Sequence, residues 1–341
     1  MPSPPSPPPP GIYVPVPTFF ASKQAANYDP AVPPVDVDTQ AAHAVYLAKS
    51  GIRGLVLFGS TGESVHVHPR DRRALLQAVR HALARDGFPD YPIVAGTATH
   101  SIEETVEQLV DAKEAGSQWG MVLVPGYNAA VTPQDGIVRW FTAVADRSPI
   151  PILVQTDKDT GGTGLAGDSY HFPGVSNMVR VAPRAFAQLA AHPNIVGCKL
   201  SHGDVSQLAQ VALNPAIDSS HFHVFTGLGQ QLVPVVSVGC VGAIDASAGC
   251  FPKTLVRLLD LACKRQPTEA EFRERRELQY KVSAMEEIVV KHGIVGVKEV
   301  IGRLRGFGDA DGSRLPLMGT VDEWEQWEPV LQAVDEVEKS L

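Results

Sequence analysis

Eight short apolar segments, separated by helical patterns, constrain the fold of this chain more than any other feature of its sequence. Each segment is four to six residues long, is apolar on both faces and is bounded by glycine, proline or polar residues. Segments of this kind are typical of parallel strands that are buried on both faces of a sheet. They span residues 12–17, 54–58, 92–96, 121–124, 151–154, 195–199, 222–226 and 241–245.

The intervals between these segments carry the signals of amphipathic helices. After Pro69, apolar residues recur with helical spacing over residues 74–83 and form one face. Ser101 and Glu104 make the pattern of a capping box at the start of the next helix. Eight strands that alternate with helices over about 250 residues match a (β/α)8 barrel, because an open doubly wound sheet more often has about five to seven strands.

We therefore predict an α/β fold, a (β/α)8 TIM barrel over residues 11–251 with a helical C-terminal extension over residues 252–341. Strand signals cease after residue 251, whereas helical patterns continue through Leu331. Residues 1–10 are mostly proline, which has no backbone N–H donor, and we expect them to form a disordered tail.

Composition argues against several classes of protein. The chain has 29 lysine and arginine residues against 37 aspartate and glutamate residues, a net charge of −8, so we expect a small-molecule ligand rather than nucleic acid. No run approaches the ~18 apolar residues of a membrane span, and no signal or transit pattern opens the chain, so we expect no membrane contact and a cytoplasmic location. The four cysteines have no paired spacing, and we expect free thiols: Cys198, Cys240, Cys250 and Cys263.

Chemistry in such a barrel is expected at the carboxyl ends of the strands. Residues 59–64 follow the second strand, and their small side chains and backbone N–H groups suit an anion. Tyr127 follows the fourth strand, and Lys199 closes the sixth. A lysine at the end of an apolar strand is unusual, because burial of an unpaired ammonium is costly.

Lys199 has two interpretations on the residues alone. Burial lowers the pKa of a lysine, and the neutral amine can attack a ketone and form a Schiff base. Alternatively, its side chain extends along apolar surface to solvent or pairs with Asp204. Lys298 offers a comparison, because it lies in a helical pattern with Val297 and Ile301, and we expect it to be solvated and protonated.

Four short motifs at the ends of these segments have an order and spacing that are typical of one family. They are Gly-Ser-Thr-Gly-Glu at 59–63, Pro-Gly-Tyr-Asn at 125–128, His-Pro-Asn-Ile-Val-Gly-Cys-Lys at 192–199 and Gly-Ala-Ile at 242–244. Together they resemble the dihydrodipicolinate synthase/N-acetylneuraminate lyase superfamily of class I, pyruvate-handling aldolases, over residues 11–320. Tyr-His-Phe-Pro-Gly-Val at 170–175 and Lys-Leu-Ser at 199–201 are similar to the fungal and animal 2-keto-3-deoxy-sugar-acid and 4-hydroxy-2-oxoglutarate aldolases.

The resemblance implies a set of catalytic residues. Lys199 would form the imine, and Tyr170 would transfer protons at the reacting carbons. Thr61 and Tyr127 would extend this proton relay to solvent. Because the imine itself is the electron sink, the resemblance implies no metal and no other cofactor.

The resemblance also implies how the 2-oxo acid is bound. Ser60 and Thr61 would hold the pyruvate carboxylate. Gly227 would let the backbone approach the substrate, and Ile244 would line the substrate site. The family further implies a homotetramer.

The sequence departs from the family pattern at two places. Val175 stands where synthases that bind a semialdehyde carboxylate have an arginine, which argues against dihydrodipicolinate synthesis. Residues 155–169 lie between the fifth apolar segment and Tyr170, where family members pass directly from strand to tyrosine. We expect this insertion to interrupt the fifth strand after Val154 and to impair activity.

The leading hypothesis is a lyase that cleaves a 2-keto-3-deoxy sugar acid or 4-hydroxy-2-oxoglutarate to pyruvate and an aldehyde through a Schiff base on Lys199. A synthase or dehydratase that uses the same imine is an alternative within enzymes. A catalytically silent barrel that serves as a binding or assembly protein is the alternative outside them. The first two hypotheses differ in their products, and the third predicts no imine.

Overall fold

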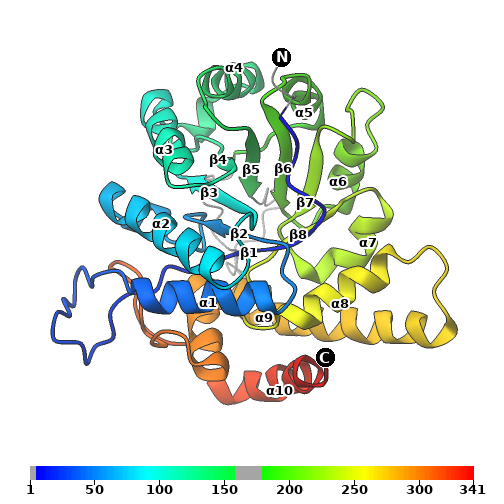
Figure 1. Cartoon of the computed structure of the whole chain (residues 1–341). Coiled ribbons are helices and arrows are strands. Elements are labelled where there is room, and N and C mark those ends of the chain that lie inside the picture. The colour runs from blue at the N-terminus through cyan, green and yellow to red at the C-terminus, as the bar shows by residue number, and fades with distance from the viewer. Residues whose placement is uncertain (1–4, 158–178) are drawn as a thin grey trace.

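The computed structural model describes residues 5–157 and 179–341, and within them it forms a closed barrel of eight parallel strands (Figure 1). Each strand pairs with the next one along the chain, and the eighth pairs with the first. The predicted TIM barrel is confirmed. Its strands are β1 (Gly11–Pro15), β2 (Gly54–Leu57), β3 (Ile93–Thr97), β4 (Trp119–Leu123), β5 (Ile152–Asp157), β6 (Ile195–Ser201), β7 (His223–Thr226) and β8 (Gly242–Ile244).

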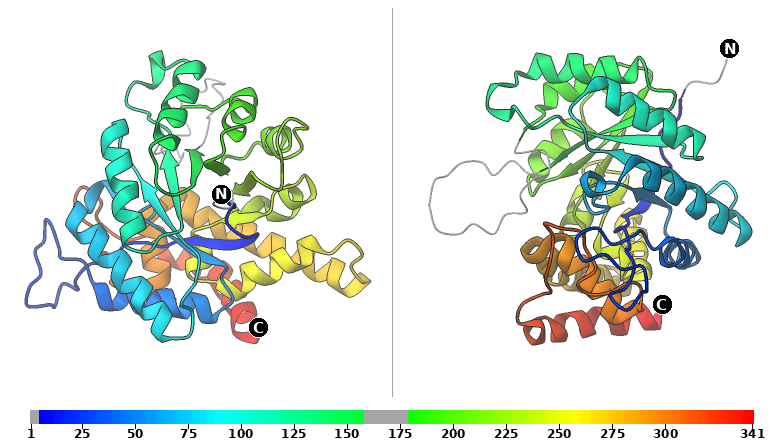
Figure 2. Two further views of the ribbon diagram at one scale, coloured as in Figure 1. Left: turned by 45° about the horizontal axis from the view of Figure 1, so that its top comes forward. Right: turned by 90° about the vertical axis from the view of Figure 1, so that its left-hand side faces the viewer.

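Helices surround the barrel and continue beyond it (Figure 2). Each strand is followed by an outer helix: α1 (Val37–Lys49), α2 (Pro69–Arg85), α3 (Ile102–Glu114), α4 (Gln134–Ala145), α5 (Pro183–Ala190), α6 (Val205–Ala212), α7 (Leu232–Ser237) and α8 (Pro252–Cys263). The chain then forms the predicted helical C-terminal region, which consists of α9 (Glu269–Arg305) and α10 (Trp324–Ser340). Because α8 directly follows β8, we group it with the outer ring, and a domain boundary at residue 252 stays a prediction.

Local sequence signals place the starts of the outer helices. His68 caps α2 by accepting a backbone N–H of the first turn, and Pro69 occupies the first helical position, where its missing N–H costs nothing. Ser101 caps α3 by accepting the Glu104 backbone N–H at 3.3 Å. In a full capping box the Glu104 carboxylate would accept the Ser101 backbone N–H. Here it accepts a hydrogen bond from the Thr99 hydroxyl instead.

Side chains fill the inside of the barrel, so that it is a core and not a pore. This inner cluster has at least one apolar residue from each strand and is separate from the larger apolar layer between strands and helices. Its members are Tyr13, Val56, Val94, Trp119, Met121, Leu153, Val196, Phe225 and Ile244. The polar residues at the carboxyl ends of the strands lie above this inner cluster.

Residues 5–10, which we expected to be part of a disordered tail, lie against the amino-terminal end of the barrel (Figure 2). Proline lacks an N–H donor but keeps its carbonyl acceptor, so a proline-rich segment can bind donors without leaving donors of its own unpaired. Three carbonyls of this segment accept hydrogen bonds from barrel side chains: Ser6 from Trp119 at 2.8 Å, Pro8 from His223 at 2.8 Å and Pro9 from Tyr13 at 2.9 Å.

β5 extends beyond Val154, where we expected the insertion at 155–169 to interrupt it. Residues 155–157 continue the parallel pairing and lie opposite residues 199–201 of β6. Backbone hydrogen bonds make this ladder, so the strand continues without the apolar side chains by which the sequence pattern marks a strand. Residues 158–178 lie outside the described part of the chain.

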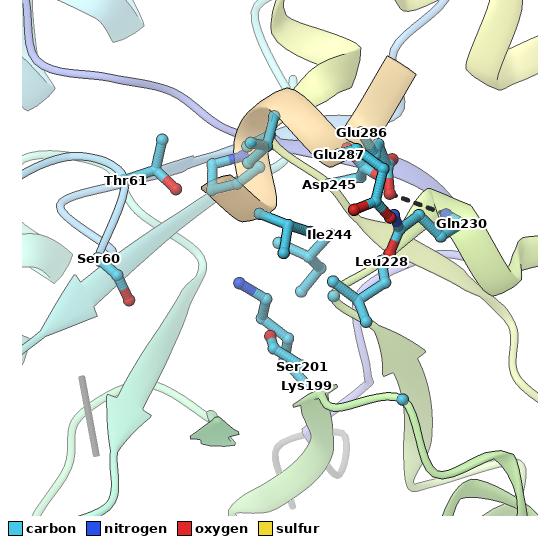
Figure 3. A pocket seen from close by; sticks show the side chains of 16 residues that line it. Ser60, Thr61, Lys199, Ser201, Leu228, Gln230, Ile244, Asp245, Glu286 and Glu287 are labelled. Atoms are coloured by element: carbon cyan, nitrogen blue, oxygen red, sulfur yellow. Dashed lines mark hydrogen bonds between the residues drawn. The ribbon is translucent and has the colours of Figure 1, made fainter. Parts of the chain in front are cut away.

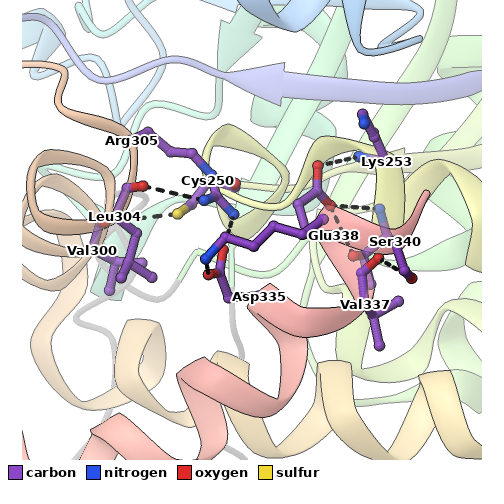
Figure 4. A network of polar contacts seen from close by, with 11 residues as sticks. Cys250, Lys253, Val300, Leu304, Arg305, Asp335, Val337, Glu338 and Ser340 are labelled. Carbon is purple, nitrogen blue, oxygen red and sulfur yellow. Dashed lines mark hydrogen bonds and ion pairs between the residues drawn. The ribbon is translucent and has the colours of Figure 1, made fainter.

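The C-terminal helix is joined to the barrel by buried polar contacts (Figure 4). The Glu338 carboxylate on α10 accepts the backbone N–H groups of Lys253 at 3.0 Å and Thr254 at 2.8 Å, in the first turn of α8. It therefore caps a helix whose own preceding residue offers no side-chain acceptor. Arg305, the last residue of α9, pairs with Asp335 of α10 at 2.7 Å. These contacts attach both C-terminal helices to the barrel.

Two further observations concern the cysteine thiols and the possibility of a membrane span. All four cysteines are free thiols, as predicted, and all except Cys263 are buried. Burial raises the pKa of the Cys240 thiol to about 12, which keeps it protonated and unreactive. Within residues 5–157 and 179–341, no helix is long and apolar enough to cross a lipid bilayer.

Candidate active site

A cavity of about 360 Å³ lies at the carboxyl ends of the strands, where a (β/α)8 barrel carries its active site (Figure 3). This volume falls at the lower end of the range of ligand pockets, about 300–1,000 Å³. Strands β1, β2, β6, β7 and β8 contribute residues at or just beyond their ends, and α9 closes one side. Five of the predicted site residues line it: Ser60, Thr61, Lys199, Gly227 and Ile244.

Lys199 lies near the end of β6 and is only 7% exposed. Its backbone is held between β5 and β7, where it lies opposite Gln155 and Phe225. Figure 3 shows its side chain pointing into the cavity, with Ser60 and Thr61 to one side. Of the two interpretations of this lysine, the structure therefore excludes a side chain that extends to solvent.

Gly227 allows the chain after β7 to pass directly against the lysine. A Cβ atom at this position would lie 2.9 Å from Lys199 Cε and would overlap the Ser201 hydroxyl. No larger residue fits without displacing one of these side chains. The glycine thus leaves room for the side chains of Lys199 and Ser201, and the resemblance implies in addition that it lets the backbone approach the substrate.

The turn after β2 carries the two hydroxyl residues predicted to bind a carboxylate. Gln155 Nε2 on β5 donates to Ser60 Oγ at 3.0 Å, and Thr18 Oγ1 donates to the Gly62 carbonyl at 2.7 Å. The turn ends at Glu63, which adopts a left-handed backbone conformation with φ of 51°. A non-glycine residue holds this conformation only where surrounding contacts fix it.

Lys298 provides one of those contacts, and our prediction that it is solvated is wrong. It is 2% exposed, its ammonium forms an ion pair with the Glu63 carboxylate, and it donates to the Gly312 carbonyl at 2.7 Å. The ammonium also lies 4.5 Å from the centre of the Phe20 ring. Burial lowers the pKa of Lys298, and the charge of Glu63 opposes this shift. Lys298 thus supports the turn at 60–63 and does not line the cavity.

Two buried carboxyl groups, Asp245 after β8 and Glu286 on α9, line the cavity together. The Gly229 backbone N–H donates to both, and the Gln230 N–H donates to Glu286 at 2.8 Å. The Ser247 hydroxyl lies 2.6 Å from Asp245 and 2.9 Å from Glu286. Burial and, secondarily, the charge of Asp245 raise the pKa of Glu286 well above its usual range, so this carboxyl holds its proton more readily than an ordinary glutamate.

Glu287, the next residue on α9, is exposed at the rim of the same cavity. Its carboxylate accepts a hydrogen bond from Gln230 Nε2 at 2.6 Å. We did not predict Asp245, Glu286 or Glu287 as site residues. The sequence holds one signal for Glu286, which lies beside Met285 at a buried position of a helix. A carboxyl group at such a position needs a hydrogen-bond or charge partner.

The two predicted tyrosines are not brought to Lys199 within the described residues. Tyr127 is 81% exposed and does not line the cavity. Its ring packs edge-to-face against His100, with ring centres 6.1 Å apart. Tyr170 lies outside the described residues, as does Val175.

Within the described ranges, no group of three or more histidine, cysteine, aspartate or glutamate side chains is placed to hold an ion.

The chain is similar to proteins of one family. A model of the "Dihydrodipicolinate synthetase family" matches residues 33–332. The chain is 33% identical over 299 residues to the "Probable 4-hydroxy-2-oxoglutarate aldolase, mitochondrial" of Emericella nidulans, which covers 88% of this chain and 86% of the relative. It is 30% identical over 356 residues to the "L-threo-3-deoxy-hexylosonate aldolase" of Aspergillus niger, with 97% of each covered. A crystal structure of a dihydrodipicolinate synthase family protein from Coccidioides immitis superposes with a TM-score of 0.79, at 27% identity and 99% coverage of both chains.

Proposed function

The chain belongs to the dihydrodipicolinate synthetase family, and on this basis we propose that it is a class I aldolase, a carbon–carbon lyase. Its substrate is a 2-keto-3-deoxy sugar acid or 4-hydroxy-2-oxoglutarate, which it cleaves to pyruvate and an aldehyde. The observation that carries this proposal is the buried Lys199 near the end of a barrel strand, pointing into a cavity that Ser60 and Thr61 also line. Burial favours the neutral form of an amine, which is the nucleophile that the reaction needs.

The proposed reaction begins when Lys199 Nζ attacks the C2 carbonyl of the substrate and water leaves, which forms a protonated imine. The C4 hydroxyl then loses its proton, the C3–C4 bond breaks, and its electron pair moves into an enamine while the aldehyde departs. The enamine takes a proton at C3, and water hydrolyses the imine to release pyruvate and the free lysine. Ser60 and Thr61 hold the C1 carboxylate through these steps by donating hydrogen bonds.

Several parts of the proposal rest on the family resemblance alone. Tyr170 is the proposed proton-transfer residue, with Thr61 and Tyr127 extending the relay to solvent. Tyr127 is exposed in the single chain, and this position does not support its role in the proton relay. A homotetramer is proposed in the same way, whereas a cytoplasmic location is proposed from the sequence and not from the resemblance. The word mitochondrial in the name of the Emericella nidulans relative describes that protein, and fractionation of cells that produce this chain distinguishes the two locations.

The proposal is tested by trapping the imine with pyruvate. Borohydride reduction in the presence of pyruvate, followed by peptide mapping, is expected to label Lys199. Lys199→Arg is the matched control, and it should take no label because a guanidinium stays protonated. Lys298 should also stay unlabelled, since Glu63 and Gly312 hold its ammonium outside the cavity. Absence of any adduct, or an adduct on Lys298 alone, contradicts the proposal.

A further inference from the structure

The two sides of the cavity have different chemistry. Ser60 and Thr61 lie to one side of the Lys199 amine in Figure 3, whereas Gln230, Glu286 and Glu287 lie to the other. In the proposed reaction the C1 carboxylate binds at the first side and C2 bonds to Lys199. The remainder of the substrate, which becomes the aldehyde, therefore extends toward the second side.

The second side presents acids, and no described residue of this side adds a cation. Asp245, Glu286 and Glu287 all line it, and Lys199 is the one cationic side chain among the described residues of the cavity wall. Lys199 is itself used in the imine, whose positive charge faces the carboxylate of the pyruvate half. Residues 158–178 include no arginine, and their single lysine is outnumbered by two aspartates.

The buried pair on this side is held rigidly. Backbone N–H groups of Gly229 and Gln230 and the Ser247 hydroxyl all point at the oxygens of Asp245 and Glu286. Their positions are set before a substrate enters, so a ligand meets fixed acceptors.

Resting on the proposed function, we propose that Asp245, Glu286 and Glu287 make this enzyme specific for 2-keto-3-deoxy acids whose far end is neutral and hydroxylated. Hydroxyl groups of such a tail donate hydrogen bonds to carboxylate oxygens. A second carboxylate, as in 4-hydroxy-2-oxoglutarate, is an acceptor with no donor to meet and is repelled by the acids. The acidic side thus selects as much by excluding one substrate class as by binding the other.

The first measurement compares kcat/KM of the full-length enzyme for cleavage of a six-carbon 2-keto-3-deoxy sugar acid and of 4-hydroxy-2-oxoglutarate. We expect a preference for the sugar acid of about tenfold or more, because unfavourable pairing of like charges costs more than the 1.4 kcal/mol of one factor of ten. Equal use of both substrates, or a preference for 4-hydroxy-2-oxoglutarate, overturns the inference.

The second measurement separates selection from a merely structural role of the acids. Glu287→Gln removes a charge at an exposed position and should reduce the preference about threefold or more while the protein stays folded. Glu277→Gln is the matched control, because it makes the same change at an exposed position of α9 outside the cavity, and it should leave the preference unchanged. Glu286→Gln, with folding checked by its thermal melting curve, should lower the preference further, because an amide N–H group replaces one carboxyl oxygen that can accept from the hydroxyls of the sugar acid. If both cavity variants fold and keep the wild-type preference, the acids hold the structure only and the inference fails.

The borohydride experiment distinguishes failure of the proposed specificity from failure of the proposed function. A pyruvate adduct on Lys199 without a substrate preference overturns the specificity alone. Absence of the adduct overturns the aldolase, and the specificity with it.

Discussion

At the residue scale, His43 shows how burial decides protonation. Its ring is fully buried, its Nε2 donates to the Gly249 carbonyl at 2.8 Å, and Phe19 and Phe307 pack against it. Burial lowers the pKa of His43 to about 4, because a charged imidazolium is poorly solvated there. In the unfolded chain a histidine has a pKa near 6.5.

We predict that His43 makes the free energy of unfolding fall as pH is lowered from about 6.5 to about 4. Over this range the unfolded chain binds a proton that the folded chain does not, so acid favours unfolding, by roughly 3 kcal/mol in total. His43→Gln keeps a hydrogen-bond donor and does not titrate, so its urea unfolding curves should depend less on pH. His81→Gln, at an exposed site, should behave as wild type. An unchanged pH dependence in His43→Gln contradicts the assignment.

At the element scale, two segments whose sequence is least typical of a barrel contribute to it. The segment at 5–10 lies across the amino-terminal end, and residues 155–157 extend β5 beside Lys199. Both are held through backbone groups, which explains why side-chain patterns do not reveal them.

Deletion of residues 1–9 is expected to lower the free energy of unfolding by about 1–3 kcal/mol, because three hydrogen bonds to barrel side chains are lost. The segment lies at the opposite end of the barrel from the cavity, so borohydride labelling with pyruvate should not change. Deletion of residues 1–4 keeps the bonding carbonyls and serves as the control in urea unfolding. Equal stability of the two deletions would show that the segment contributes nothing.

The position of Gln155 makes the effect of the insertion testable. Gln155 lies opposite Lys199 and donates to Ser60. Deletion of residues 155–169 joins Val154 to Tyr170 and thus places the tyrosine at the position that Gln155 now occupies. We expect a more stable and more active protein, since the removed residues are glycine-rich and polar, and closing such a loop costs a few kcal/mol of chain entropy.

A shorter deletion is the control for this prediction. Removal of residues 158–169 places Tyr170 directly after Asp157, three positions later, where the alternation of a strand turns its side chain to the other face. Melting temperature and pyruvate-release rate are compared among the wild type and both deletions. Only the longer deletion should raise both values, and loss of both folding and activity in it would show that the segment is an integral part of the site.

At the scale of the whole molecule, the C-terminal helices complete the cavity of the proposed active site. α9 closes the cavity with Glu286 and Glu287, and α10 holds α9 and α8 through Asp335 and Glu338 (Figure 4). The barrel alone would leave one side of the cavity open to water.

Glu338→Ala is expected to lower the free energy of unfolding by about 1–3 kcal/mol, because two backbone N–H groups in the first turn of α8 lose their acceptor. Glu336→Ala is the control on the same helix, since Glu336 makes no contact with α8 among the hydrogen bonds and ion pairs of the described residues. Urea unfolding measures both variants, and pyruvate labelling of Lys199 should persist in each. A wild-type stability of Glu338→Ala would refute the capping role.

The sequence by itself determined the barrel and the place of its lysine. Each strand shows its burial through neighbouring apolar residues, and this local pattern places Lys199 near the end of a buried strand. The sequence left open whether its side chain is buried or reaches solvent, and the fold decided this by leaving it 7% exposed. The cap at Ser101 is likewise local, because its side chain and the Glu104 N–H that it accepts lie within one turn. Ser60, Thr61, Gly227 and Ile244 were placed by resemblance in strand-end motifs, and the closed barrel brings them to one cavity.

Only the tertiary structure decided which distant groups meet. Helical periodicity places Lys298 on a face of α9, but its burial depends on Glu63, which the fold brings from the turn after β2. In the same way the fold brings Asp245 beside Glu286 at one side of the cavity, and the carbonyl of Ser6 meets Trp119. A periodic pattern indicates which face of an element is buried. It does not indicate which residue packs on that face, because that residue is often far away in the sequence. The pKa shifts and the specificity depend on which residue it is.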